Sequence, residues 1–181
     1  PDNFSAENNI LPAEEIPESG TENAEYGVSL QGNFSGWDLM LYHAYFYNDQ
    51  ARVVFEFNPS PLGSGLETKS RVHDRLKLNG TGMSLVSGSW LWKAEAAQVS
   101  GFRFYGTDQE YERQDLMFGI EYAGISNASL GFEISRRSYP DFDSILENPP
   151  NNADKHVVQS AFNYRQDFWN QTLHLNSFAL I

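Results

Sequence analysis

The chain of 181 residues contains no cysteine, which excludes a disulfide framework, thiol chemistry and a cysteine-based zinc site. It has only 12 lysines and arginines against 24 acidic residues. The resulting net charge of −12 leaves no basic face for nucleic acid, and it argues against electrostatic anchoring on anionic lipid. No run of 18 apolar residues occurs, which excludes a membrane-spanning helix.

Apolar residues instead recur at every second position, and no segment combines a helix cap with apolar residues at helical spacing. Near the start, Tyr26, Val28 and Leu30 alternate with polar Ser29 and Gln31. A period of two is typical of a strand whose two faces meet different surroundings. The pattern predicts eight strands, at about residues 25–34, 37–47, 72–85, 90–99, 114–122, 128–137, 157–167 and 172–181.

The connections between these strands alternate between two classes. The tight ones lie at about residues 35–36, 86–89, 123–127 and 168–171. The long, polar ones, which hold most of the proline, lie at about residues 1–23, 48–71, 100–113 and 138–156. Long loops at one rim and short turns at the other are typical of outer-membrane barrels. The sequence therefore predicts an all-β, antiparallel, up-and-down transmembrane β-barrel segment, with residues 1–23 as a long external loop and residues 24–181 as four hairpins.

Alternation alone also fits a soluble barrel, because the two kinds of barrel differ in which face meets water. The chain has only four lysines, fewer than the outer surface of a soluble barrel usually carries. Aromatic residues gather at or beside the tight turns, as an interfacial girdle requires: Phe34, Trp37, Trp90, Tyr122, Phe168 and Trp169. These features favour the membrane barrel, with a soluble barrel or sandwich as the alternative.

Two stretches, residues 88–97 (GSWLWKAEAA) and 113–124 (RQDLMFGIEYAG), resemble strands of porin-like outer-membrane proteins of Gram-negative bacteria. The resemblance is to large barrels of unknown function, and it covers most of the chain from about Ala24 onward. It implies a location in the bacterial outer membrane and a barrel considerably longer than this chain. Its motifs are architectural, so no catalytic residue is carried over from it.

Charged residues follow the polar positions of the predicted strands. A charge facing lipid costs about 2–4 kcal/mol near the bilayer midplane. Because the charged residues fall on the same side of each strand as the other polar residues, we expect them to face the lumen. The predicted pore-lining set is Arg75, Lys77, Lys93, Glu95, Glu121, Glu133, Asn163 and Arg165, with Ser29 and Gln31 on the same side. The predicted lipid-facing set is Val28, Leu30, Phe118, Ile120, Phe132 and Phe162. The charges either select solutes or brace the inner wall as ion pairs.

Signals for catalysis or metal binding are weak. The four histidines, His43, His73, His156 and His174, show no metal-ligand spacing, and no serine has a nucleophile-elbow pattern. Asp141 and Asp143 lack the further spaced ligands of a calcium loop, so a solvated loop is the simpler interpretation. We therefore expect no enzyme activity, no cofactor and no metal.

The function that these features favour is a porin-like channel for passive diffusion of small solutes. Its partners would be the bilayer of the outer membrane and the solutes in the lumen. Two alternatives stay open: a structural or ligand-binding barrel with a plugged lumen, and an enzyme on the barrel rim. Charges of lumen parity nearly balance, so any pore is expected to prefer cations only modestly.

Strand direction gives a further expectation. The first strand ends at the tight turn at residues 35–36 and the eighth begins after the turn at residues 168–171, so both outer ends of this segment lie at the long-loop rim. Complete bacterial barrels have even strand counts and normally keep both termini in the periplasm. The segment is thus expected to be internal to a barrel of ten or more strands, and to fold as an open, curved sheet whose first and eighth strands do not pair.

Overall fold

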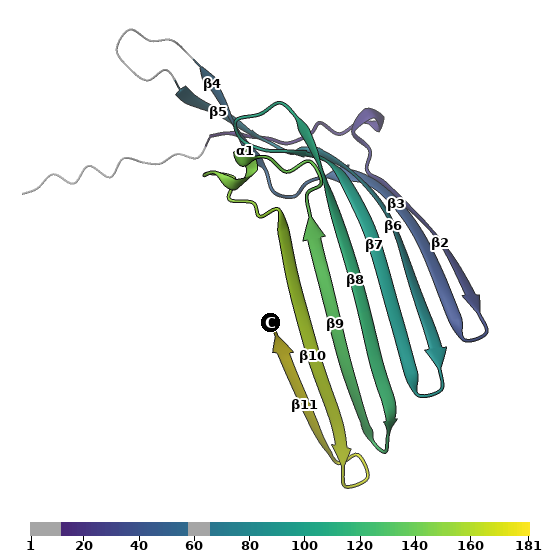
Figure 1. Cartoon of the computed structure of the whole chain (residues 1–181). Helices are drawn as coiled ribbons and strands as arrows, with labels where there is room; N and C mark the ends of the chain where they lie inside the picture. The colour runs from purple at the N-terminus through teal and green to yellow at the C-terminus, as the bar shows by residue number, and fades with distance from the viewer. Residues whose placement is uncertain (1–11, 58–65) are drawn as a thin grey trace, which may run out of the picture.

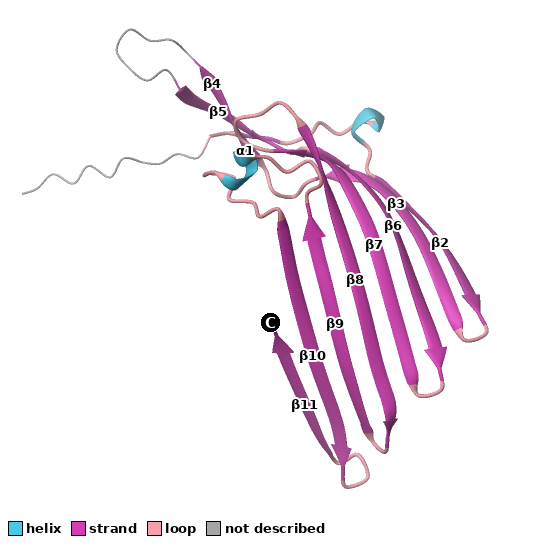
Figure 2. Ribbon diagram, in the orientation of Figure 1, coloured by secondary structure: helices cyan, strands magenta, loops and turns pink. Residues whose placement is uncertain are grey.

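The computed structural model describes residues 12–57 and 66–181. An antiparallel sheet of eight strands dominates it (Figures 1 and 2), in the spatial order β11-β10-β9-β8-β7-β6-β3-β2. Its strands are β2 (Tyr26–Phe34), β3 (Trp37–Tyr47), β6 (Arg75–Ser87), β7 (Trp90–Arg103), β8 (Glu110–Ile125), β9 (Ala128–Ser138), β10 (His156–Phe168) and β11 (Leu173–Leu180). The predicted all-β class and antiparallel order are confirmed.

A second, smaller sheet lies at the long-loop end. It has the order β1-β5-β4, from β1 (Glu14–Glu15), β4 (Arg52–Phe57) and β5 (Leu66–Val72). Within the connection predicted at residues 48–71, residues 52–57 and 66–71 are strand, which was not predicted, and residues 58–65 lie outside the described residues. The prediction of a third strand beginning at Val72 is wrong, because β6 begins at Arg75. Val72 pairs with Arg52 and, in parallel, with Glu15. The sequence of β5, LETKSRV, is mostly polar and lacks apolar residues at every second position, so alternation does not predict it as a strand.

The strands extend further toward the loops than their alternation indicates. β7 runs to Arg103 and β8 begins at Glu110, so most of the predicted loop at residues 100–113 is strand. Between Ser100 and Phe102 the register shifts at a bulge, where Gly101 has a φ of +101°. A side chain would be strained at that φ, and its Cβ would meet the carbonyl oxygen of Arg75. The tight turns lie within about three residues of their predicted positions, and the predicted loop at 138–156 contains one helical turn, α1 (Ser144–Glu147).

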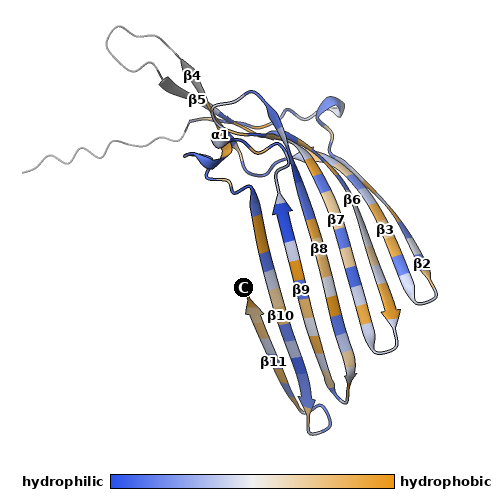
Figure 3. Cartoon of the chain, in the orientation of Figure 1, coloured by the Kyte–Doolittle hydropathy of each residue, from blue (hydrophilic) through white to orange (hydrophobic). Residues whose placement is uncertain are grey.

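Cross-strand register assigns every residue of the large sheet to one of two faces. We call the side that carries Trp92, Phe118 and Phe132 the apolar face, and the side that carries Lys93 and Glu133 the polar face. Figure 3 shows the resulting alternation along the strands. The six residues predicted to share the lipid side all lie on the apolar face, and Ser29, Gln31, Glu121, Glu133 and Asn163 all lie on the polar face. Their grouping onto two faces is confirmed.

The hydrophobic pattern changes sides along β6. Near the tight turn, Met83 and Leu85 lie on the apolar face, opposite Ala94 and Trp92 of β7. Near the long loops, the apolar residues of β6 lie on the polar face, where Leu76 is only 3% exposed. The reason is that a covering of loops lies over the polar face at this end, so the side that is buried differs between the two halves of the strand.

The buried hydrophobic side chains of the described residues all lie at this loop end: Leu76, Val99, Tyr111 and Leu146, of which Tyr111 and Leu146 are fully buried. Tyr111 donates a hydrogen bond from its hydroxyl to Asp143 at 2.8 Å, and Phe104 packs edge-on against the Tyr111 ring. Asp143 also caps α1 by accepting from the Ile145 amide. The segment that contains α1 is therefore held against the loop end of β8 rather than extending freely from it.

The large sheet is open and curved (Figure 1). The outer edges of β2 and β11 pair with no other strand among the described residues, as expected for strands one and eight. No helix in the described part of the chain has the length and apolar character needed to cross a membrane.

Candidate functional site

The centre of the polar face carries a lysine held between two glutamates. Lys93 lies on β7, and its Nζ is 3.9 Å from Glu121 Oε2 of β8 and 3.8 Å from Glu133 Oε1 of β9. The three side chains are each between 36% and 44% exposed. Such pairs are solvated and contribute about 0–1 kcal/mol each to stability. Lys93 offsets only one of the two glutamate charges, so the centre of the polar face stays negative.

Gly119 makes this arrangement possible. It lies in register between Lys93 and Glu133, on the strand between them. A Cβ at position 119 would lie 3.2 Å from Glu133 Cγ and 3.6 Å from Lys93 Cβ. The absent side chain leaves the space through which the lysine and the glutamate reach each other. Sequence alternation predicted Lys93, Glu121 and Glu133 on one face, and the structure brings them together.

Two further ionic groups flank this centre. Toward the long loops, Asp115 accepts from Arg113 and Arg137, both at 2.9 Å. Toward the tight turns, Asp167 of β10 lies 3.6 Å from Arg165 and 2.6 Å from the His174 ring nitrogen. Arg165 was expected in the polar set. Arg113 and Arg137 were not among the predicted residues: Arg113 lies in the predicted connection at residues 100–113, whereas Arg137 has the same parity as Glu133 in the predicted strand 128–137, which was the available signal.

The remaining predicted residues of this face lie beside glycines or in a hollow. Asn163 of β10 lies against Gly131, whose missing side chain leaves it room. Glu95 shares with Tyr42 and Asp115 a polar hollow of about 260 Å³. The charged residues of the polar face then comprise six carboxylates, Asp38, Glu95, Asp115, Glu121, Glu133 and Asp167, against the four bases Lys93, Arg113, Arg137 and Arg165.

Arg75 and Lys77 do not belong to this surface. Lys77 pairs with Tyr45 and Ser100, and Arg75 with Tyr47, which places both on the apolar face at its loop end. The guanidinium of Arg75 lies 4.4 Å from the ring centres of Tyr45 and Tyr47 and donates to the carbonyls of Glu22 and Ala24. The expectation that all eight predicted residues share one face is therefore wrong for these two. The alternation placed them on the side opposite Leu76 and Leu78, which were expected on the apolar face. At this end of β6 the two leucines lie on the polar face instead.

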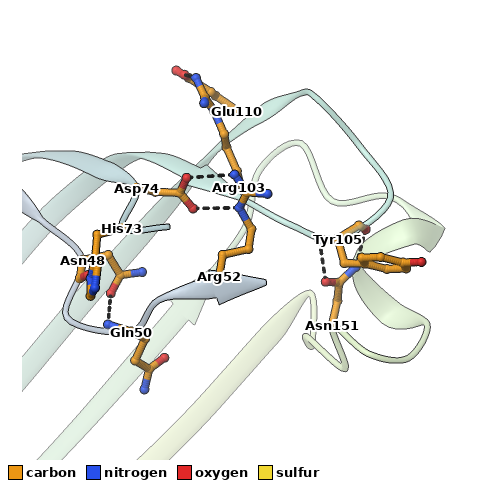
Figure 4. Close-up of polar contacts among 9 residues, drawn as sticks. All are labelled: Asn48, Gln50, Arg52, His73, Asp74, Arg103, Tyr105, Glu110 and Asn151. Carbon is orange, nitrogen blue, oxygen red and sulfur yellow. Dashed lines mark hydrogen bonds and ion pairs between the residues drawn. The ribbon is translucent and has the colours of Figure 1, made fainter. Parts of the chain in front are cut away.

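At the loop end, β4, β6 and β7 bring together a second polar group (Figure 4). Asp74 is buried and accepts two hydrogen bonds from Arg52 Nε and Nη2, both at 3.1 Å. Arg103 pairs with Glu110 at 2.5 Å, and Asn151 links to the backbone of Tyr105. The Arg52–Asp74 pair joins β4 of the small sheet to the start of β6, Arg103 and Glu110 join β7 to β8, and Asn151 holds the connection after α1 against the β7–β8 connection. Local sequence does not predict these contacts, because Arg52, Arg103 and Asn151 all lie in predicted connections rather than in predicted strands.

The four histidines lie at separate places. His43 contacts Asn79, His156 contacts Arg136, and His174 contacts Asp167. His73 contacts the Asn48 carbonyl at 2.6 Å and Glu14 at 2.9 Å. The carbonyl of Asn48, and then the Glu14 carboxylate, raise the pKa of His73, and the same histidine, followed by Arg71, lowers the pKa of Glu14.

The described residues contain no group of three or more metal-ligating side chains. Asp143, one of the two loop acids considered for calcium, is instead the cap of α1 and the acceptor for Tyr111. No family model, curated protein or solved structure matches this chain.

Proposed function

We propose that this chain forms part of the wall of a transmembrane β-barrel in a bacterial outer membrane, and that its polar face lines a channel for passive diffusion of small solutes. The observation that carries the proposal is the separation of two unlike faces on a single sheet. From β2 to β10, most of the large apolar side chains that stay exposed lie on the apolar face, including Leu30 at 71% and Phe118 at 45%. An exposed apolar surface that crosses several strands is typical of an interaction surface.

The aromatic residues give this apolar face the borders that a bilayer requires. At the tight-turn end, Phe34 stacks on Trp37 with ring centres 4.1 Å apart, and Trp90 lies 4.5 Å from Tyr122. Eight residues away along β2, Tyr26 lies beside Tyr45 of β3. That separation is roughly 26 Å along the strand, or about 20 Å along the normal of a tilted barrel, close to the apolar band of such proteins.

Backbone hydrogen bonding supports the same proposal. In hydrocarbon every N–H and C=O needs a partner within the protein, and the six inner strands of the sheet pair on both edges. The polar face, with its solvated charges, would then line water. The slight excess of carboxylates on it agrees with a modest preference for cations.

A second candidate, a barrel with an occluded lumen, draws on one observation. The loop end of the polar face is covered by the segment that contains α1, with Leu146 fully buried. If the polar face lines the lumen, that segment narrows the mouth on this side. Such a barrel would serve structure or ligand binding rather than diffusion.

Two measurements on the full-length protein test these proposals. Flotation with lipid vesicles, followed by resistance to carbonate extraction, tests insertion into the membrane. Ion current across a planar bilayer then separates an open channel from an occluded barrel. Discrete conductance steps would support the channel, and stable insertion without any current would favour the occluded barrel. Failure to float would reject both and favour a soluble barrel or sandwich.

A further inference from the structure

A shallow groove crosses the apolar face over β6 to β9. The small side chains of Ala94 and Ala96 lie along its middle, and larger ones of the adjacent strands, Met83, Leu116 and Phe118, rise beside them. Its volume is about 630 Å³, within the range of roughly 300–1,000 Å³ that is typical of small-ligand sites. The groove is thus large enough for an aliphatic chain and offers it almost only carbon.

One cation borders this apolar groove. Arg136 lies in the same row as Ala96, with Leu116 and Val158 as its partners on the two neighbouring strands. Its Nη2 is 3.2 Å from Nδ1 of His156, which lies one row nearer the long loops. The guanidinium therefore extends from the groove toward the loop end. No carboxylate of the described residues forms an ion pair with it.

A cation at the edge of an apolar surface needs an anionic partner once that surface is removed from water. The planar guanidinium presents paired N–H groups that match two oxygens of a phosphate. An aliphatic groove that ends at an arginine is complementary to a molecule with an acyl chain and a negatively charged phosphate head.

We propose that this groove is a binding site for one anionic phospholipid, with an acyl chain over Ala94 and Ala96 and its phosphate on Arg136. The site rests on the proposed function, because the groove meets lipid only if the apolar face does. The net charge of −12 repels anionic lipid in general. A preference for such a lipid would therefore report a local site rather than attraction to the whole protein.

The test uses the full chain in detergent, titrated with phosphatidylglycerol or with zwitterionic phosphatidylcholine, with bound lipid counted by native mass spectrometry. Arg136→Gln is expected to weaken phosphatidylglycerol binding about tenfold, as expected for the loss of a charge-assisted hydrogen bond. Arg137→Gln removes the same charge from the adjacent position on the polar face and should leave lipid binding unchanged. Ala96→Phe fills the groove and should reduce binding of both lipids.

Equal binding of the two lipids, or equal affinity in the wild type, Arg136→Gln and Arg137→Gln, would overturn the proposal. Circular dichroism verifies that Ala96→Phe is folded, and the Arg136→Gln comparison stands without that variant. Vesicle flotation distinguishes a failure of the lipid site from a failure of membrane insertion. A wild type that floats but shows no lipid preference refutes the lipid site alone, whereas a wild type that does not float refutes the membrane proposal beneath it.

Discussion

Replacing Lys93 by glutamine is expected to increase the cation preference of the proposed channel. Lys93 Nζ lies within 3.9 Å of Glu121 and 3.8 Å of Glu133, so its loss leaves two carboxylates without their shared cation. At about 4 Å in a water-like medium one unit charge is worth about 1 kcal/mol. A change of that size in the energy of a permeating ion corresponds to about a fivefold change in its relative permeability.

The measurement is the reversal potential of Lys93→Gln in a planar bilayer under a potassium chloride gradient. Lys155→Gln removes the same charge from the loop between β9 and β10 and should shift the potential far less. An unchanged potential in Lys93→Gln, or an equal shift in the two variants, would refute the placement of the polar face along the ion path. If the variant instead loses only thermal stability, the ion pairs brace the wall and do not select ions.

Three further outcomes follow from the contacts. Gly119→Leu should weaken the sheet by about 1–3 kcal/mol in urea unfolding, because its Cβ meets Glu133, and an unchanged midpoint would contradict that packing. Asp74→Asn should lower the hydrogen-exchange protection of β4 by about 1–3 kcal/mol, because Arg52 loses its buried anionic partner. As a control, Glu110→Gln removes a carboxylate from an exposed ion pair and should lower protection by about 0.5 kcal/mol or less. Because the pKa of His73 is raised in the folded protein, its contacts stabilise the small sheet fully below pH 6.5, the ordinary pKa, and this stabilisation is lost as pH rises through the raised pKa. Because the pKa of Glu14 is lowered, its contacts stabilise the same sheet fully above pH 4.5, and this stabilisation is lost as pH falls through the lowered pKa. Proteolysis of this sheet should therefore be slowest between about pH 4.5 and 6.5, and a flat profile in the wild type, or an unaltered one in His73→Gln, would contradict the coupling.

Local sequence is enough to predict the strands in which one side is apolar over most of their length. In β2, β8 and β9, a period of two assigns each residue to a face, since neighbouring side chains of a strand must point to opposite sides. That rule correctly united Lys93, Glu121 and Glu133, which lie on three consecutive strands. The four tight turns also follow from local chemistry, and with them the antiparallel order.

The rest of the fold depends on contacts between segments that are distant in the sequence. Alternation shows that a strand has two unlike sides, and it does not show which side another segment will cover. Along β6 the buried side changes, since Leu76 at the loop end is buried on the polar face. Arg75 and Lys77 were misplaced for that reason. At the same end the segment around α1 is held to β8 by Tyr111 and Asp143, 32 residues apart. The β4–β5 hairpin and the Arg52–Asp74 pair likewise exist only because chain folding joins residues whose local sequence carries no shared period.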